Sequence, residues 1–171
     1  MKHDYNLVYS DFYTNYIQLA QQGELKKVLK KNSRKFLDLL DDIPKSKIDY
    51  SYGKDKWTIK QLLQHITDAE RVFAYRALRV ARYDQTPLPG FDENTWAEHA
   101  DVSKRDWNDM VKEFRLLRRS NQLMIESFSS EQLAATGTAS NHPISVAALC
   151  FILAGHVEHH MNIIRERYLI K

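Results

Sequence analysis

The sequence predicts an all-α protein whose main unit is a four-helix bundle. Apolar residues recur at steps of three and four through four long segments of the 171-residue chain, which is the spacing of amphipathic helices. Alternating strand-like runs are missing, and so are the Asn-Gly and Asp-Gly dipeptides that favour β-hairpins. Four amphipathic helices bury their apolar faces most simply against one another, as a bundle.

The first part of the chain is expected to lie outside the bundle. Residues 1–22 are interpreted as an N-terminal extension packed on it, with a short helical piece around residues 12–19. Residues 23–171 are expected to form the four-helix domain, which is of ordinary single-domain size. Its first long helix is predicted from Glu24 to about Asp41, because proline follows shortly afterwards and stops a helix.

The second helix has a clear start signal. Thr58 followed three residues later by Gln61 forms a capping box, in which each side chain bonds the other residue's backbone N–H. The helix is predicted to continue to about Arg82. Two prolines and a glycine then indicate a long loop through residues 83–94, which is long enough to cross an end of the bundle.

The third and fourth helices are marked in the same way. Ser103 with Asp106 is expected to open a helix that runs to about residue 127, and Ser129 begins a second capping box and a short helical turn. Residues 137–143 are expected to be a loop. The last helix is predicted over residues 145–168, with one face formed by Val146, Leu149, Leu153, His156, His160, Ile163 and Ile164.

Composition limits the function classes. The net charge is only +3, and the basic clusters alternate with apolar residues as on solvated helix faces, so neither a nucleic-acid nor a membrane partner is expected. The single cysteine, Cys150, cannot form an internal disulfide, which suits a reducing compartment. No signal peptide or membrane span is indicated. The protein is therefore expected to be cytoplasmic.

Three histidines fall on apolar sides of predicted helices and predict a metal site inside the bundle. His156 and His160 are four residues apart, so their rings can reach one point. His65 lies between the buried positions Leu62 and Ala69 and can close the triangle from the facing helix. Three neutral imidazoles leave a divalent cation open positions for water or substrate. Histidines that are only hydrogen-bonded in the core are the alternative.

Other polar residues near these histidines have weaker or different roles. Asp68, one helical turn after His65, is the predicted catalytic base or ligand-orienting residue, or else it pairs with a basic neighbour. His159 is the rival of His160 as a ligand. Glu158 lies about 200° around the helix from His156 and is expected to point away, unlike the glutamate of a helical zinc-protease motif.

Six further residues are assigned no direct chemistry. His3, His99 and His142 fall in predicted loops or termini and are expected to be exposed. Cys150 is interpreted as a packed, inert thiol. Asparagines on apolar stripes are explained equally well as pocket-lining residues or as tolerated helix-interface residues, and they are Asn32 and Asn121.

Three stretches of the chain carry a family resemblance. They read G-K-D-K-W-T-I-K-Q-L-L-Q-H-I-T-D-A-E at residues 53–70, P-L-P-G-F-D-E-N at residues 87–94 and G-H-V-E-H-H-M-N-I-I-R-E-R-Y at residues 155–168. In this order and spacing they resemble the DinB/YfiT-like superfamily of four-helix-bundle proteins. The resemblance covers nearly the whole chain from about Tyr9 onward.

The resemblance implies a divalent ion, most often nickel or zinc, held by one histidine of the second helix and two of the fourth. Carried over, these are His65, His156 and His160. Similar members are described as metal-dependent hydrolases or as transferases that use a low-molecular-weight thiol, and dimers are common among them. The family name refers to DNA-damage induction, so the resemblance implies a stress response as the context. Because dimers are common among similar members, it also implies a homodimer.

Three functions remain open on the sequence alone. The first is a thiol S-transferase that acts on electrophilic small molecules, favoured because no glutamate base accompanies the histidines and a metal-bound thiol ionises more easily than water. The second is a metal-dependent hydrolase with Asp68 as base. The third is a noncatalytic metal-binding stress-response module. Three imidazoles suit zinc, nickel, iron and manganese to differing degrees, and the preference for nickel or zinc is what the resemblance implies.

Overall fold

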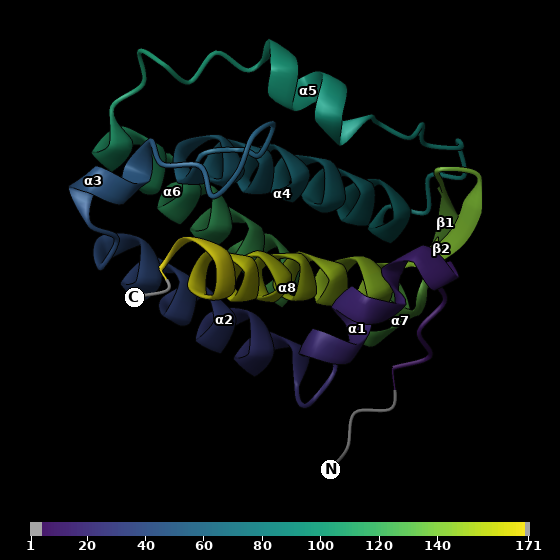
Figure 1. Cartoon of the computed structure of the whole chain (residues 1–171). Coiled ribbons are helices and arrows are strands. Elements are labelled where there is room, and N and C mark those ends of the chain that lie inside the picture. Colours follow the sequence, from purple (N-terminus) through teal and green to yellow (C-terminus); the bar gives the residue numbers. More distant parts are fainter. Residues whose placement is uncertain (1–4, 170–171) are drawn as a thin grey trace.

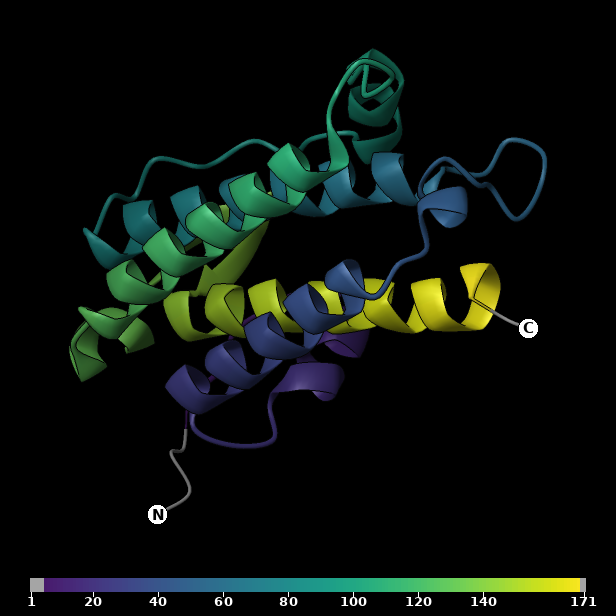
Figure 2. The ribbon, with the colours of Figure 1, turned by 90° about the vertical axis from the view of Figure 1, so that its left-hand side faces the viewer.

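The computed structural model describes residues 5–169 and contains four long helices. They are α2 (Leu25–Asp41), α4 (Ile59–Ala81), α6 (Trp107–Glu126) and α8 (Val146–Ile163). Both α4 and α2 lie against α6 on one side and α8 on the other (Figure 1 and Figure 2). The predicted four-helix bundle is confirmed. His3 lies outside the described residues.

The helix directions explain the long connection between α4 and α6. In both views α2 and α8 run one way and α4 and α6 run the opposite way. Because α4 and α6 are parallel, the chain must return over the length of α4, about 34 Å, before α6 can begin. Residues 82–106 make this return along the outer side of α4 and include a short helix, α5 (Glu93–His99). The long connection that the sequence predicts is confirmed, and it runs along the bundle and not only across one end of it.

The helix starts follow the side-chain caps that the sequence predicts. At α4, the Thr58 hydroxyl accepts from the backbone N–H of Gln61 (3.1 Å), and the Gln61 side chain accepts from the backbone N–H of Thr58 (2.8 Å). Asp106 caps α6, which therefore begins a few residues after the predicted start at Ser103, and Ser145 caps α8. A second capping box at Ser129 begins α7 (Ser130–Ala134). Each cap satisfies backbone donors that a helix end leaves without a partner.

Two further short elements lie in the connections between the long helices. One is α3 (Lys45–Ile48), between α2 and α4. The other is the antiparallel hairpin of β1 (Thr136–Ala139) and β2 (His142–Ser145), in the region predicted as a loop over residues 137–143. The two turn residues between the strands, Ser140 and Asn141, have φ angles of 51° and 65°. Positive φ at both positions is typical of a type I′ turn, which Ser-Asn forms here without the more usual Asn-Gly.

The N-terminal segment packs on α8. It contains a short 3₁₀ turn, η1 (Asp11–Tyr13), and α1 (Thr14–Ala20), and α1 crosses α8 at Gly155. A Cβ atom at Gly155 would lie 1.9 Å from the carbonyl oxygen of Tyr16, so only glycine permits this approach. With α1 added to α2 and α4, α8 is covered on all sides, which explains why residues 146–157 are all buried.

The core combines apolar packing with one buried ion pair. The Phe36 and Phe114 rings meet edge to face, with centroids 4.9 Å apart. Arg118 of α6 lies 2.8 Å from the Glu70 carboxylate of α4, and both side chains are 1% exposed. Beyond α8, η2 (Ile164–Tyr168) continues as a π-helical turn. Within residues 5–169, every helix is too short or too polar to cross a bilayer.

Candidate metal centre

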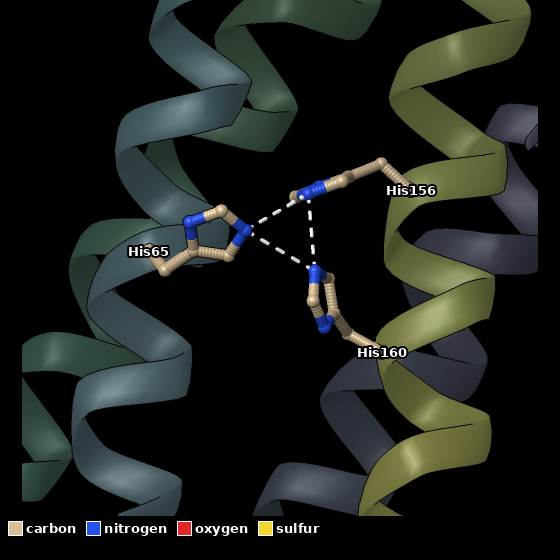
Figure 3. Close-up of side chains that lie close together, drawn as sticks. All are labelled: His65, His156 and His160. Carbon is tan, nitrogen blue, oxygen red and sulfur yellow. Dashed lines mark hydrogen bonds between the residues drawn. The ribbon is translucent and has the colours of Figure 1, made fainter. Parts of the chain in front are cut away.

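Two neighbouring helices present the three histidines to one another. His65 stands two turns after the capped start of α4, while His156 and His160 follow one another by one turn on α8. Figure 3 shows the three rings pointing into the space between α4 and α8. The structure thus brings together the residues that spacing and resemblance both selected.

The Nε2 atoms of the three rings form a nearly equilateral triangle. The Nε2 atom of His65 is 3.1 Å from that of His156 and 3.2 Å from that of His160, and the last two are 3.1 Å apart. Each Nε2 atom either carries a proton or presents a lone pair. In a triangle at least two of the three must be alike, so hydrogen bonds alone cannot satisfy all three contacts. A cation that accepts all three lone pairs does satisfy them.

The triangle has the size that a metal ion requires. Zinc–nitrogen bonds of about 2.0–2.1 Å place neighbouring ligand atoms about 2.9 Å apart in octahedral geometry and about 3.3 Å apart in tetrahedral geometry. The separations of 3.1–3.2 Å lie between these values. The donor set, His65, His156 and His160, therefore fits a divalent transition-metal ion with positions left for water or another ligand.

Burial keeps the rings neutral. Burial lowers the pKa of His65 from 6.5 to about 4, although the nearby Glu93 carboxylate opposes the shift. It lowers the pKa of His156 and His160 well below the usual value, and each of these two rings adds to its own burial the repulsion of neighbouring histidines. Neutral imidazoles are the form that binds metal. The buried Nδ1 atom of His160 has no hydrogen-bond partner within residues 5–169.

The triad borders a cavity of about 570 Å³, a size typical of small-molecule sites. Its walls come from α1, α4, α5, α8 and the hairpin, and the described residues of α2 and α6 do not contribute. Figure 3 shows α2 and α6 behind the histidines. The site is therefore in a groove between α4 and α8, on the face covered by α1 and α5. The site was predicted to lie inside the bundle, and this placement is wrong. The cavity lies on a side of α8 that is covered by α1, which is not one of the four bundle helices.

The cavity is rich in aromatic rings that the sequence reasoning did not assign to the site. The Tyr16 ring meets His156 edge to face at 5.4 Å, and the Trp57 ring lies 4.9 Å from that of His65. Glu93, the first residue of α5, also lines the cavity. The aromatic lining residues are Phe12, Tyr13, Tyr16, Trp57, Phe73 and Phe91. Phe91 and Glu93 belong to the P-L-P-G-F-D-E-N stretch that carries part of the family resemblance, and this stretch was the sequence feature that could have assigned them to the site.

Asp68 is placed differently from the predicted catalytic base. Its carboxylate accepts two hydrogen bonds of 3.0 Å from the Gln64 side chain and forms an ion pair of 3.2 Å with Arg71. Asp68 does not line the cavity. This matches the alternative of pairing with a basic neighbour, and the catalytic role of Asp68 stays a prediction. Glu93 is the carboxylate on the cavity wall.

The remaining polar residues of the two helices serve packing. Glu158 points away from the triad, as predicted: it accepts from Asn32 of α2 (3.1 Å) and pairs with Lys35 (3.7 Å). Asn121 donates to Glu70 (2.8 Å), so the two asparagines line helix interfaces and not the cavity. Cys150 is fully buried, and burial raises the pKa of its thiol.

The other histidines of the described chain, His99, His142 and His159, do not join the triad. The His159 ring packs against Tyr16, and its Nδ1 atom lies 3.5 Å from the Asn15 amide. The structure therefore favours His160 over His159 as the third ring. His99 on α5 and His142 on β2 are exposed, as expected, and His142 lies on the rim of the cavity.

Comparison with known proteins agrees with this architecture. A family model described as the DinB superfamily matches residues 29–164, which include all three histidines. The chain belongs to the DinB superfamily. This DinB-superfamily chain is similar in fold to the solved structure of YfiT from Bacillus subtilis, which is described as a candidate metal-dependent hydrolase with an unusual four-helix bundle topology. The two structures superpose with a TM-score of 0.73 at 19% identity, over 83% of this chain and 82% of that one.

Two curated relatives of this DinB-superfamily chain come from Oceanobacillus iheyensis. One is 27% identical over 129 residues, 72% of each chain, and the other is 32% identical over 63 residues, 36% of each chain. The names of both describe candidate metal-dependent hydrolases.

Proposed function

We propose that His65, His156 and His160 hold a divalent ion, zinc or nickel by preference, and that the chain is a metal-dependent hydrolase of small molecules. The observation that carries the proposal is the convergence of three neutral Nε2 atoms on one wall of an aromatic cavity. The names of the two curated relatives support it. When bound, such an ion acts as a Lewis acid and lowers the pKa of a water ligand.

The residues around the triad have complementary tasks. Glu93 lines the cavity, influences the pKa of both His65 and Tyr16, and has no ion-pair partner within residues 5–169. It is therefore placed to accept the proton of an attacking water. Trp57 and Tyr16 flank two of the imidazoles, hold their orientation and keep bulk water from that side. The aromatic walls bind the apolar part of the substrate.

Thiol transfer is the second candidate, and the position of Glu93 is the reason for ranking it below hydrolysis. The sequence favours transfer because no glutamate base accompanies the histidines. Glu93 reaches the cavity from α5, so that reason for preferring a thiol falls away. What still favours transfer is the size of the cavity, which has room for a thiol beside an electrophile. In that reaction the chain would conjugate a low-molecular-weight thiol to an apolar electrophile.

Metal content and activity test the proposal together. Zinc-loaded or nickel-loaded protein is assayed on a panel of aryl esters and lactones, with and without added glutathione or bacillithiol. We expect thiol-independent hydrolysis that requires bound metal. His160→Ala should lose both the metal and turnover while staying folded by circular dichroism. The matched variant His159→Ala should keep the metal and the turnover. Conjugates formed only with thiol would establish transfer, and unfolding on loss of the ion would indicate a structural metal.

The carboxylates are separated by a matched pair of variants. Glu93→Gln is expected to lower kcat about 10²-fold or more with metal content unchanged, because a positioned general base contributes roughly 10²–10⁴-fold. Asp68→Asn should retain most activity. The reverse result would assign the base to Asp68, as the sequence predicted.

A further inference from the structure

A buried arginine lies behind the wall of the cavity. Arg76 of α4 is 2% exposed, yet no carboxylate within residues 5–169 lies within 4.0 Å of its guanidinium. The other fully buried arginine, Arg118, is paired with Glu70 at 2.8 Å. A guanidinium withdrawn from water is costly unless an anion compensates it. Arg76 therefore differs from Arg118 in having no anionic partner among the described residues.

The hydrogen bonds of Arg76 leave it incompletely satisfied. Its Nη2 atom donates to the carbonyl oxygen of Pro89 (2.6 Å) and to the hydroxyl of Ser140 (3.1 Å). Its Nη1 atom is buried and has no acceptor within the described part of the chain. One face of the guanidinium packs near the Phe91 ring, 5.8 Å from its centroid. Neutral partners thus hold the group in place without balancing its charge.

The surroundings of Arg76 are the wall of the histidine cavity. Ser140, Gly90 and Phe91 all line that cavity, and the first and last of these contact the guanidinium. Arg76 also follows His65 by eleven residues on α4, which is about three turns, so both lie on the same stripe of the helix about 16 Å apart. Ala69 and Phe73, which lie between them on this side of α4, line the cavity floor.

We propose that Arg76 is the anion subsite of this cavity and binds a carboxylate on the substrate, at the end opposite the three histidines. The Ser140 hydroxyl occupies one position that a carboxylate oxygen would take, and Nη1 offers the second. Exchanging the hydroxyl for a carboxylate gives the guanidinium the two parallel bonds that it accepts best. The substrate class that follows is a small molecule with an aromatic or aliphatic body and one terminal carboxylate.

This inference rests on the proposed function only in placing the substrate's reactive group at the triad. Carboxylate binding itself needs no turnover. It is measured by isothermal titration of the zinc-loaded protein with 4-phenylbutyrate and with the uncharged 4-phenylbutyramide, which has the same shape. We expect the acid to bind about 10-fold or more tightly than the amide, since a charged hydrogen bond is worth roughly 1.5–3 kcal/mol.

Variants identify the group that recognises the charge. Arg76→Met should abolish the preference for the acid, whereas Arg82→Met, at an exposed position of the same helix region, should keep it. His160→Ala should also keep it. Loss of the preference in His160→Ala, with retention in Arg76→Met, would show that the acid binds the metal ion, which overturns this inference and leaves the hydrolase proposal intact.

Two further outcomes decide against the subsite. Equal affinity of acid and amide for the unaltered protein would overturn it without any variant, so the test survives even if Arg76→Met fails to fold. A lower melting temperature of Arg76→Met with an unchanged acid-to-amide ratio would show that Arg76 only anchors the loop at Pro89. Ser140→Ala provides a second check, because it should bind the acid at least as tightly as the unaltered protein does.

Discussion

Replacing Gly155 by alanine should destabilise the protein, although the same change stabilises most helices. Alanine is favoured over glycine within a helix by about 1 kcal/mol. Here the new Cβ atom would lie 1.9 Å from the carbonyl oxygen of Tyr16 and 2.5 Å from its carbonyl carbon. Ordinary contact begins near 3.4 Å. The α1 backbone must therefore move away from α8 by about 1.5 Å.

The magnitude follows from what α1 buries. Ile17 is fully buried and Tyr13 is 8% exposed, both against this part of the core. Partial exposure of two large apolar side chains, each worth about 1.5–3 kcal/mol when fully buried, outweighs the gain in helix propensity. We expect a net loss of about 2–4 kcal/mol in the free energy of unfolding. For a chain of this size that lowers the melting temperature by about 5–15 °C.

Differential scanning calorimetry of metal-free protein is the assay, with Gly53→Ala as the matched control. A Cβ atom at Gly53 meets its nearest neighbour, the Lys56 side chain, at 3.5 Å, so this variant should melt within about 2 °C of the unaltered protein. Because Tyr16 also packs on His156, Gly155→Ala should weaken zinc binding as well. A variant that melts at or above the unaltered protein would refute the close approach of α1 and α8.

Two other predictions concern buried charge. The folded-state pKa of His65, about 4, lies below its unfolded value of 6.5, so on acidification the unfolded chain binds a proton that the folded chain does not. Through this residue, the free energy of unfolding of the metal-free protein should therefore fall by about 3 kcal/mol between pH 6.5 and pH 4. Urea unfolding at a series of pH values measures this change. A free energy of unfolding that does not vary with pH would contradict burial of a neutral ring. Glu70→Ala strands Arg118 in the core and should cost about 3–5 kcal/mol in the same assay, while Asp41→Ala, which breaks the exposed pair with Arg115, should cost less than about 1 kcal/mol.

The helices could be predicted because their signals are local. The capping boxes at Thr58 and Ser129 and the apolar spacing of the long segments depend on residues within a few positions of one another. The three histidines could be selected for a related reason, since His156 and His160 share a face of one helix whatever surrounds it. His65 was selected by its place between the buried positions Leu62 and Ala69, and the resemblance selected the same residue.

The features that the sequence analysis missed depend on residues far apart in the chain. The Ser140–Asn141 turn adopts positive φ angles, and Leu88 pairs with the resulting hairpin from the α4–α6 connection. Glu93 and Arg76 took no part in the predicted site, because their value comes from the cavity that the connection and the hairpin enclose. Asp68 is a different case: it was selected by its spacing from His65, it pairs with Arg71 on the same helix, and its catalytic role stays a prediction.

The amino-acid sequence alone determined that this chain is helical, where its long helices begin and which three imidazoles can share a ligand. Such properties arise from backbone hydrogen bonding and from a repeat of 3.6 residues, which act over one or two turns. Only the tertiary structure decided that the triad faces an aromatic groove outside the bundle core, with Glu93 on its wall and Arg76 behind it. Those positions depend on α4 and α6 being parallel and on α1 packing over Gly155, and contacts between distant segments settle both.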